Sequence, residues 1–264
     1  MFSKISVLLF LVLCCLFGCD KNEINYGEFD KLAGNQALLK INNVSYYSDN
    51  RLTYFKINDK RVSGLLSARS PFPGGGYNTG GASTPDFLSV SAGTLKLSIA
   101  LPYKVDTGMD SIVLYTTNLE ISGGKNYVVN ITDTAANTKS FLTELSFTRA
   151  DTAKSKYRFV NLMPNVPSVD LYYGTSATVH TADTLIAGNV NYLSVTGDII
   201  LKSGQAKTWK VRPAGAALTT GTILASYTSA STFTSERVYT IFASGYSGQT
   251  LAPRRPYVSF FLVR

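Results

Sequence analysis

Alternating apolar and polar positions recur along the chain from Ala37 onward and predict β-strands. At the first such stretch, Leu39 and Ile41 alternate with Lys40 and Asn42, which is typical of a half-buried strand. The same pattern predicts strands at 37–43, 52–57, 87–90, 94–101, 111–116, 127–131 and 141–147. It then restarts at 157–161, 169–174, 192–195, 199–201, 207–212, 222–227, 238–243 and 257–263. No helical periodicity appears beyond the first residues, so an all-β protein is predicted.

The two runs of strands show an internal likeness. Residues 87–97 resemble 192–202, residues 52–59 resemble 169–174, and residues 125–131 resemble 236–242. Order and approximate spacing agree, and the polar stretch 149–156 separates the two runs. We therefore expect two tandem antiparallel β-sandwiches of about seven strands each, at 36–148 and 157–264, joined by a linker at 149–156.

The N-terminus has the pattern of a secretory leader. A basic start at Lys4 precedes an apolar run that is too short to span a bilayer as a helix. Leu16-Phe17-Gly18-Cys19 ends that run and resembles the lipobox of bacterial lipoproteins. The resemblance implies that residues 1–18 are a signal peptide, that Cys19 is lipidated and that 19–35 is a tether. An uncleaved anchor, or a signal peptide with an incidental cysteine, is the alternative.

Composition and charge limit the partners. All three cysteines lie within the first 19 residues, so the predicted sandwiches contain no disulfide. The formal charge of +8 is scattered over residues such as Lys40, Lys210 and Arg212, without a block of like charges. We interpret these cations as a solvated surface and expect no nucleic-acid partner. The expected location is lipid-anchored at the outer membrane, on its periplasmic face or at the cell surface.

A further resemblance lies in the second half. Arg158 to Gly174 contains a strand, a proline-bearing loop and a Val-Asp-Leu-Tyr strand, and it resembles the opening of the domain-of-unknown-function family 4397. Residues 192–197 and 239–245 fit the same family, so the resemblance covers Tyr157 to about Gly248. It implies an immunoglobulin-like sandwich on secreted bacterial proteins, often lipoproteins of the Bacteroidota type, and no known reaction. The first half departs from the pattern because it lacks the proline pair.

Three aromatic residues are candidates for ligand binding. Trp209, the only tryptophan, could stack on a sugar if exposed, although a sandwich-core position is the competing interpretation. Tyr173 follows Tyr172 in a predicted strand, where one of the two rings faces outward. Tyr77 lies in a Gly/Pro/Ser stretch at 69–85, which we interpret as a flexible loop, with ligand contact as the alternative.

The sequence contains no recognisable catalytic set. His180 is the only histidine and belongs to no nucleophile motif, and no metal site or cofactor is expected. We therefore expect a non-catalytic envelope lipoprotein that binds an envelope glycan or protein, or acts as a spacer. The alternative is a glycan-binding or glycan-hydrolysing protein of a polysaccharide-processing system. Hydrolysis would use two of the acids at Asp86, Glu120, Glu144, Asp170 and Glu236.

Overall fold

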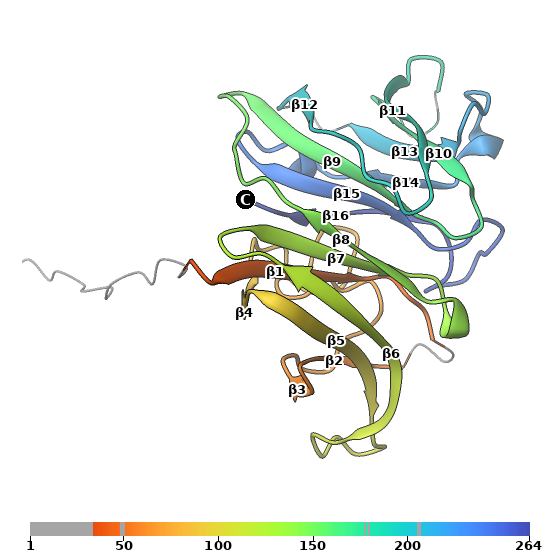
Figure 1. The fold of residues 1–264 in the computed structure, drawn as a ribbon. Helices are drawn as coiled ribbons and strands as arrows, with labels where there is room; N and C mark the ends of the chain where they lie inside the picture. The colour runs from red at the N-terminus through yellow and green to blue at the C-terminus, as the bar shows by residue number, and fades with distance from the viewer. Residues whose placement is uncertain (1–33, 48–50, 177, 179, 205–206) are drawn as a thin grey trace, which may run out of the picture. The chain divides into compact units, whose positions relative to one another are not determined.

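The computed structural model describes residues 34–264 except 48–50, 177, 179 and 205–206 (Figure 1). The predicted signal peptide and Cys19 lie outside the described residues, as does most of the predicted tether. The regular secondary structure of the described residues is β-strand apart from three short 3-10 turns, which confirms the all-β prediction. Within that part, no helix is long and apolar enough to cross a membrane.

The first half of the chain forms two four-stranded sheets. One has the order β4-β1-β7-β8 and the other the order β3-β2-β5-β6. The strands are β1 (Gln36–Asn43), β2 (Tyr54–Ile57), β3 (Lys60–Arg61), β4 (Leu88–Ser91), β5 (Gly93–Pro102), β6 (Asp110–Ile121), β7 (Asn126–Thr132) and β8 (Lys139–Glu144). Apolar side chains from both sheets, such as Leu39, Leu97 and Val129, are buried together in one core. This half is therefore a β-sandwich.

The second half repeats this arrangement strand for strand. Its sheets have the orders β12-β9-β15-β16 and β11-β10-β13-β14, which are the first-half orders with eight added to each number. The strands are β9 (Lys154–Leu162), β10 (Ser168–Gly174), β11 (Thr184–Asn191), β12 (Ile199–Lys202), β13 (Thr208–Pro213), β14 (Ala225–Thr228), β15 (Val238–Ser244) and β16 (Tyr257–Leu262). Each half thus contains eight strands in one topology, rather than the expected seven.

One pairing in each half differs from the antiparallel expectation. β1 runs parallel to β7, and β9 runs parallel to β15, while the other strand pairs of these sheets are antiparallel. Parallel neighbours require a long crossover connection. In each half, the strands of the other sheet lie within this crossover connection. The chain therefore completes the other sheet of each sandwich before its late strand returns to pair with its first strand.

The two sandwiches pack against each other. Val44, Val128 and Phe141 of the first half share a hydrophobic cluster with Val160, Phe242 and other residues of the second. Residues 34–264 fall within one compact unit. β15 and β16 are buried at every position because they face this cluster on one side and the second-half core on the other. The stretch 149–156, predicted as a linker, contributes its last residues to β9, which begins at Lys154.

The glycine-rich stretch 69–85 fastens the two halves together. Tyr77 and Phe260 exchange backbone hydrogen bonds, with N to O distances of 2.8 and 3.0 Å, so the loop adds a bridge to the free edge of β16. The Asn78 side-chain amide donates to the Val258 carbonyl, and the Ser259 hydroxyl donates to the Asn78 carbonyl, both at 2.9 Å. The sequence predicted a flexible loop at 69–85, whereas in the structure these hydrogen bonds fix the loop against β16. We call residues 69–85 the clasp.

Candidate functional site

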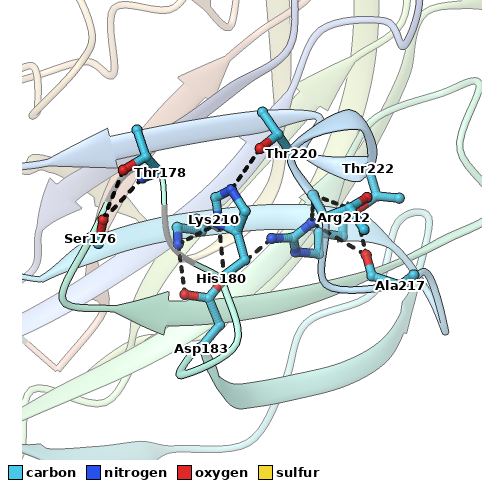
Figure 2. Close-up of polar contacts among 10 residues, drawn as sticks. Ser176, Thr178, His180, Asp183, Lys210, Arg212, Ala217, Thr220 and Thr222 are labelled. Carbon is cyan, nitrogen blue, oxygen red and sulfur yellow. Dashed lines mark hydrogen bonds and ion pairs between the residues drawn. The ribbon is translucent and has the colours of Figure 1, made fainter.

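The most polar buried cluster lies on the sheet formed by β11, β10, β13 and β14. Along β13, Trp209 and Val211 are packed in the second-half core, so the alternating Lys210 and Arg212 point to the opposite face. Both cations are nevertheless fully buried. Residues of the β10–β11 and β13–β14 connections cover them (Figure 2). The expectation of a solvated surface is therefore wrong at Lys210 and Arg212, and also at Lys40, which is fully buried.

Asp183 joins the two cations. Its Oδ1 lies 2.6 Å from Lys210 Nζ and its Oδ2 lies 3.2 Å from Arg212 Nη2, with all three side chains excluded from solvent. Gly174 at the end of β10 makes room for this carboxylate, since a Cβ there would lie 2.1 Å from Asp183 Oδ1. Arg212 also donates to the carbonyls of Ala217 and Thr219. The cluster therefore ties both connections to the sheet.

His180 is close to a hydroxyl and a carboxylate, as in a nucleophile–histidine–acid set. Its Nε2 lies 3.0 Å from Thr220 Oγ1, and its Nδ1 lies 3.6 Å from Asp183 Oδ2. However, Lys210 Nζ lies 3.0 Å from the same Nδ1. An ammonium group can only donate, so Nδ1 accepts and the ring proton sits on Nε2.

That tautomer decides what the cluster can do chemically. With its proton on Nε2, His180 donates to Thr220 and cannot take the proton of that hydroxyl. A histidine that activates a nucleophile needs the reverse arrangement, with the proton on Nδ1 facing the acid. Removing one member would leave the other buried charges unpaired. The geometry therefore fits a structural ion network rather than a hydrolytic site.

The sequence-predicted aromatic residues are largely used for packing. Trp209 is 0% exposed, stacks on Phe233 with ring centroids 5.0 Å apart, and donates from Nε1 to Thr232 Oγ1 at 3.1 Å. It offers no face to a ligand, because it is fully buried among the side chains of the second-half core. The structure thus matches the core interpretation of this residue.

Tyr173 and Tyr77 are both half-buried. The ring of Tyr173 packs edge-on against Trp209, and Lys207 Nζ lies 4.0 Å from the centre of the Tyr173 ring. Tyr77 packs against Tyr239 within the clasp, with ring centroids 6.3 Å apart. The structure therefore does not bring Trp209, Tyr173 and Tyr77 together around one cavity.

An open groove instead lies beside the clasp, at the edge of β14. It has a volume of about 430 Å³ and combines aromatic, amide, hydroxyl and guanidinium groups. It is lined by Asn78, Leu224, Ala225, Ser226, Tyr227, Gln249, Thr250, Arg255, Pro256 and Tyr257. None of these lining residues is an acid. Sequence reasoning missed this groove, although Asn78 directly follows the candidate Tyr77.

Cations fix the aromatic floor of the groove. The Arg255 guanidinium lies 4.9 Å from the ring centroid of Tyr257, and the Arg69 guanidinium lies 3.2 Å from the same centroid. Burial lowers the pKa of Arg69, which is held behind the groove by the Asn78 carbonyl and the Ser259 hydroxyl. Tyr227 packs its ring 6.0 Å from Phe260. The groove thus combines the half-buried ring of Tyr227 and the exposed guanidinium of Arg255, while Tyr257 is buried beneath the two guanidinium groups.

The acids considered for hydrolysis are held by other partners. Asp170 accepts from the backbone N–H groups of Asn189 and Gly215 at 2.7 and 2.9 Å, so it fixes two turns. Glu144 pairs with Lys125, and Glu236 pairs with Arg149. The described residues also contain no group of three or more His, Cys, Asp or Glu side chains that could hold a metal ion.

The described residues thus form an all-β protein of two eight-stranded sandwiches. Residues 77–172 match the family model described as a domain of unknown function (DUF4397). The match runs from the clasp through β10, so it overlaps the resemblance noted at 157–248 only at 157–172. The resemblance to this family is therefore supported, with different boundaries.

Other comparisons add little. No curated protein matches the chain. A solved structure described as "Alpha-glucan binding by a streptococcal virulence factor" aligns at 10% identity over 84% of this chain and 96% of that chain, with a TM-score of 0.24. A TM-score this low carries no conclusion about the fold or the ligand of this chain.

Proposed function

We propose that the protein is a non-catalytic lipoprotein of the cell envelope that binds a glycan in the groove beside the clasp. The observation that carries the proposal is the half-buried ring of Tyr227 beside the amide of Asn78 and the exposed guanidinium of Arg255 in one groove. Aromatic faces pack against the C–H surface of a sugar ring, while amide and guanidinium groups bind its hydroxyl groups. An acidic glycan would gain further from Arg255.

The anchoring part of the proposal depends on the leader. Leu16-Phe17-Gly18-Cys19 has the spacing at which lipoproteins are cleaved and acylated, and several acyl chains on Cys19 would hold the sandwiches at a membrane. We place the protein at the outer membrane, on its periplasmic face or at the cell surface. The absence of catalysis is supported by the tautomer of His180 and by the lack of an acid among the groove-lining residues.

A glycan array followed by titration calorimetry on the purified protein tests the binding function. We expect binding to an envelope or dietary polysaccharide, and a loss of affinity of at least about tenfold with Tyr227→Ala or Arg255→Ala, because hot-spot aromatic and arginine side chains contribute 1–2 kcal/mol or more. Tyr103→Ala is the matched control, since Tyr103 is half-exposed and outside the groove.

Two results would contradict the proposal. Absence of binding by the parent protein across the array would remove the glycan function and favour a protein-binding or spacer role. Release of reducing ends from a bound polysaccharide would instead support the hydrolase alternative. Intact-mass analysis of membrane-extracted protein tests the anchor separately, since acylation of Cys19 requires a mass consistent with cleavage after Gly18 and added acyl chains.

A further inference from the structure

The far end of the β5–β6 hairpin and the neighbouring residue Leu52 expose several large apolar side chains. Of the nine large hydrophobic residues exposed in the described part of the chain, six lie here. They are Leu52, Tyr103, Val105, Met109, Ile112 and Val113, with exposed fractions between 46% and 73%. Figure 1 shows the hairpin end projecting beyond its sheet. We call this surface the hairpin tip. Clusters of this kind mark surfaces that contact a partner.

The charges around the hairpin tip favour an anionic partner. Asp106 is neutralised by Arg61, with two N to O distances of 2.8 and 3.0 Å, and Asp110 is neutralised by Lys56 at 2.6 Å. Lys104 lies in the turn itself and has no acid partner among the described residues. The tip therefore presents apolar side chains together with a net positive charge.

We infer that the hairpin tip inserts into the interfacial region of an anionic lipid surface. Tyr and Lys are the side chains that concentrate at the boundary between headgroups and acyl chains, and Tyr103 and Lys104 are adjacent here. A projecting turn suits shallow insertion, and Lys104 adds attraction to anionic headgroups. The proposal is independent of the glycan groove, whose lining residues are not shared with the tip.

A tryptophan reporter tests insertion at a single position. Trp209 is the only tryptophan and is fully buried, so the emission of a second tryptophan on the surface can be distinguished. The full chain carrying Val105→Trp, or Met109→Trp as a second variant, is titrated with phosphatidylcholine vesicles containing phosphatidylglycerol. We expect a blue shift of the emission and quenching by brominated lipid.

Leu251→Trp is the matched control, because Leu251 is 78% exposed but lies in the second half. Its emission should not shift, even if the lipidated N-terminus holds the whole protein on the vesicle. Lys104→Glu, in the Val105→Trp background, should raise the lipid concentration at half-shift by roughly fivefold or more, since each Lys near an anionic surface contributes about 1 kcal/mol. Lys202→Glu, an exposed lysine of the second half, should not.

Several results would overturn the inference. The first is an unchanged emission maximum for both Val105→Trp and Met109→Trp, in variants that melt like the parent. The second is an equal blue shift for Leu251→Trp. The third is an equal blue shift with purely zwitterionic vesicles. A blue shift that appears without vesicles and grows with protein concentration would assign the hairpin tip to a second copy of the chain. Loss of glycan binding by Tyr227→Ala would leave all these outcomes unchanged, so the two proposals fail separately.

Discussion

Tyr77 and Phe260 exchange both of their backbone hydrogen bonds, although they come from different sandwiches and lie 183 positions apart (260 − 77). The bridge continues the sheet of the second sandwich with a residue from a loop of the first. It also positions Asn78 at the groove. The clasp therefore couples the stability of the two halves to the geometry of the proposed binding site.

Gly76→Ala should open this clasp. A Cβ at Gly76 would lie 2.0 Å from the Phe260 carbonyl oxygen, and backbone atoms cannot move aside as a flexible side chain can. We expect the variant to lose about 1–3 kcal/mol of unfolding free energy, as overpacked sites do. Equilibrium urea unfolding measures this. Gly64→Ala is the control, because nothing lies within 4 Å of its Cβ position. Equal unfolding free energies for the two variants would show that the contact between the clasp and β16 does not stabilise the protein.

Asp183→Asn should lower the unfolding free energy far more than the loss of an ion pair on the protein surface does. The substitution keeps the shape of the side chain but leaves Lys210 and Arg212 buried without their shared anion. Breaking a buried ion pair costs about 3–5 kcal/mol. Asp59→Asn is the comparison, because the Asp59–Lys96 pair is exposed and screened by solvent and should contribute little to stability. Similar costs in urea unfolding would show that the ion network is open to solvent.

Alternation of apolar and polar residues predicted most of the strands but not all. β11 was missed because it is largely exposed, and Gly188 and Asn189, the latter with φ +53°, interrupt its alternation at a register shift. Residues 192–195 were predicted as a strand but follow β11 as a turn, with Leu193 at φ +62°. The pattern of apolar and polar residues within a stretch cannot show whether that stretch will pair by hydrogen bonds with a neighbouring strand.

The candidate site was less accessible to sequence reasoning. The groove joins Asn78 to Tyr227 and Arg255, which come from the β3–β4 connection, strand β14 and the β15–β16 connection and share no motif. Lys210 and Arg212 alternate with core residues as solvent-facing residues do, and only the covering connections bury them. Trp209 stood out because it is unique, although its alternation with Lys210 placed it in the core. Tertiary contacts, not residue type, decided each of these outcomes.

Trp209→Ala should therefore act on folding rather than on ligand binding. The indole contacts Tyr157, Phe233 and Phe260 in the second-half core, and its removal leaves a large cavity. Such truncations cost about 3–5 kcal/mol. Thermal unfolding should show a lower midpoint, whereas Tyr103→Ala at the exposed hairpin tip should leave the midpoint nearly unchanged. A Trp209→Ala protein that melts like the parent but loses a ligand would instead place the indole in a binding site.

Lys40 gives the protein a pH dependence with a definite sign. Its Nζ donates to the Pro73 carbonyl and lies 4.8 Å from the Phe87 ring centroid, and burial lowers its pKa from 10.5 to about 8. Between pH 8 and 10.5 the unfolded chain holds a proton at Lys40 that the folded chain has released. Linkage then requires the unfolding free energy to rise with pH across this range.

Lys40→Met removes this titration, so the parent protein should gain about 2 kcal/mol relative to the variant between pH 7 and pH 9.5, at about 1.4 kcal/mol per pH unit above pH 8. Urea unfolding of both proteins at several pH values measures the difference, and the other titrating groups cancel in it. Lys96→Met, at an exposed lysine paired with Asp59, is the control for removal of a lysine that is not buried, and the difference for Lys40→Met should rise more steeply with pH than the difference for Lys96→Met. A flat difference for Lys40→Met would mean that the Lys40 ammonium stays charged and solvated in the folded protein.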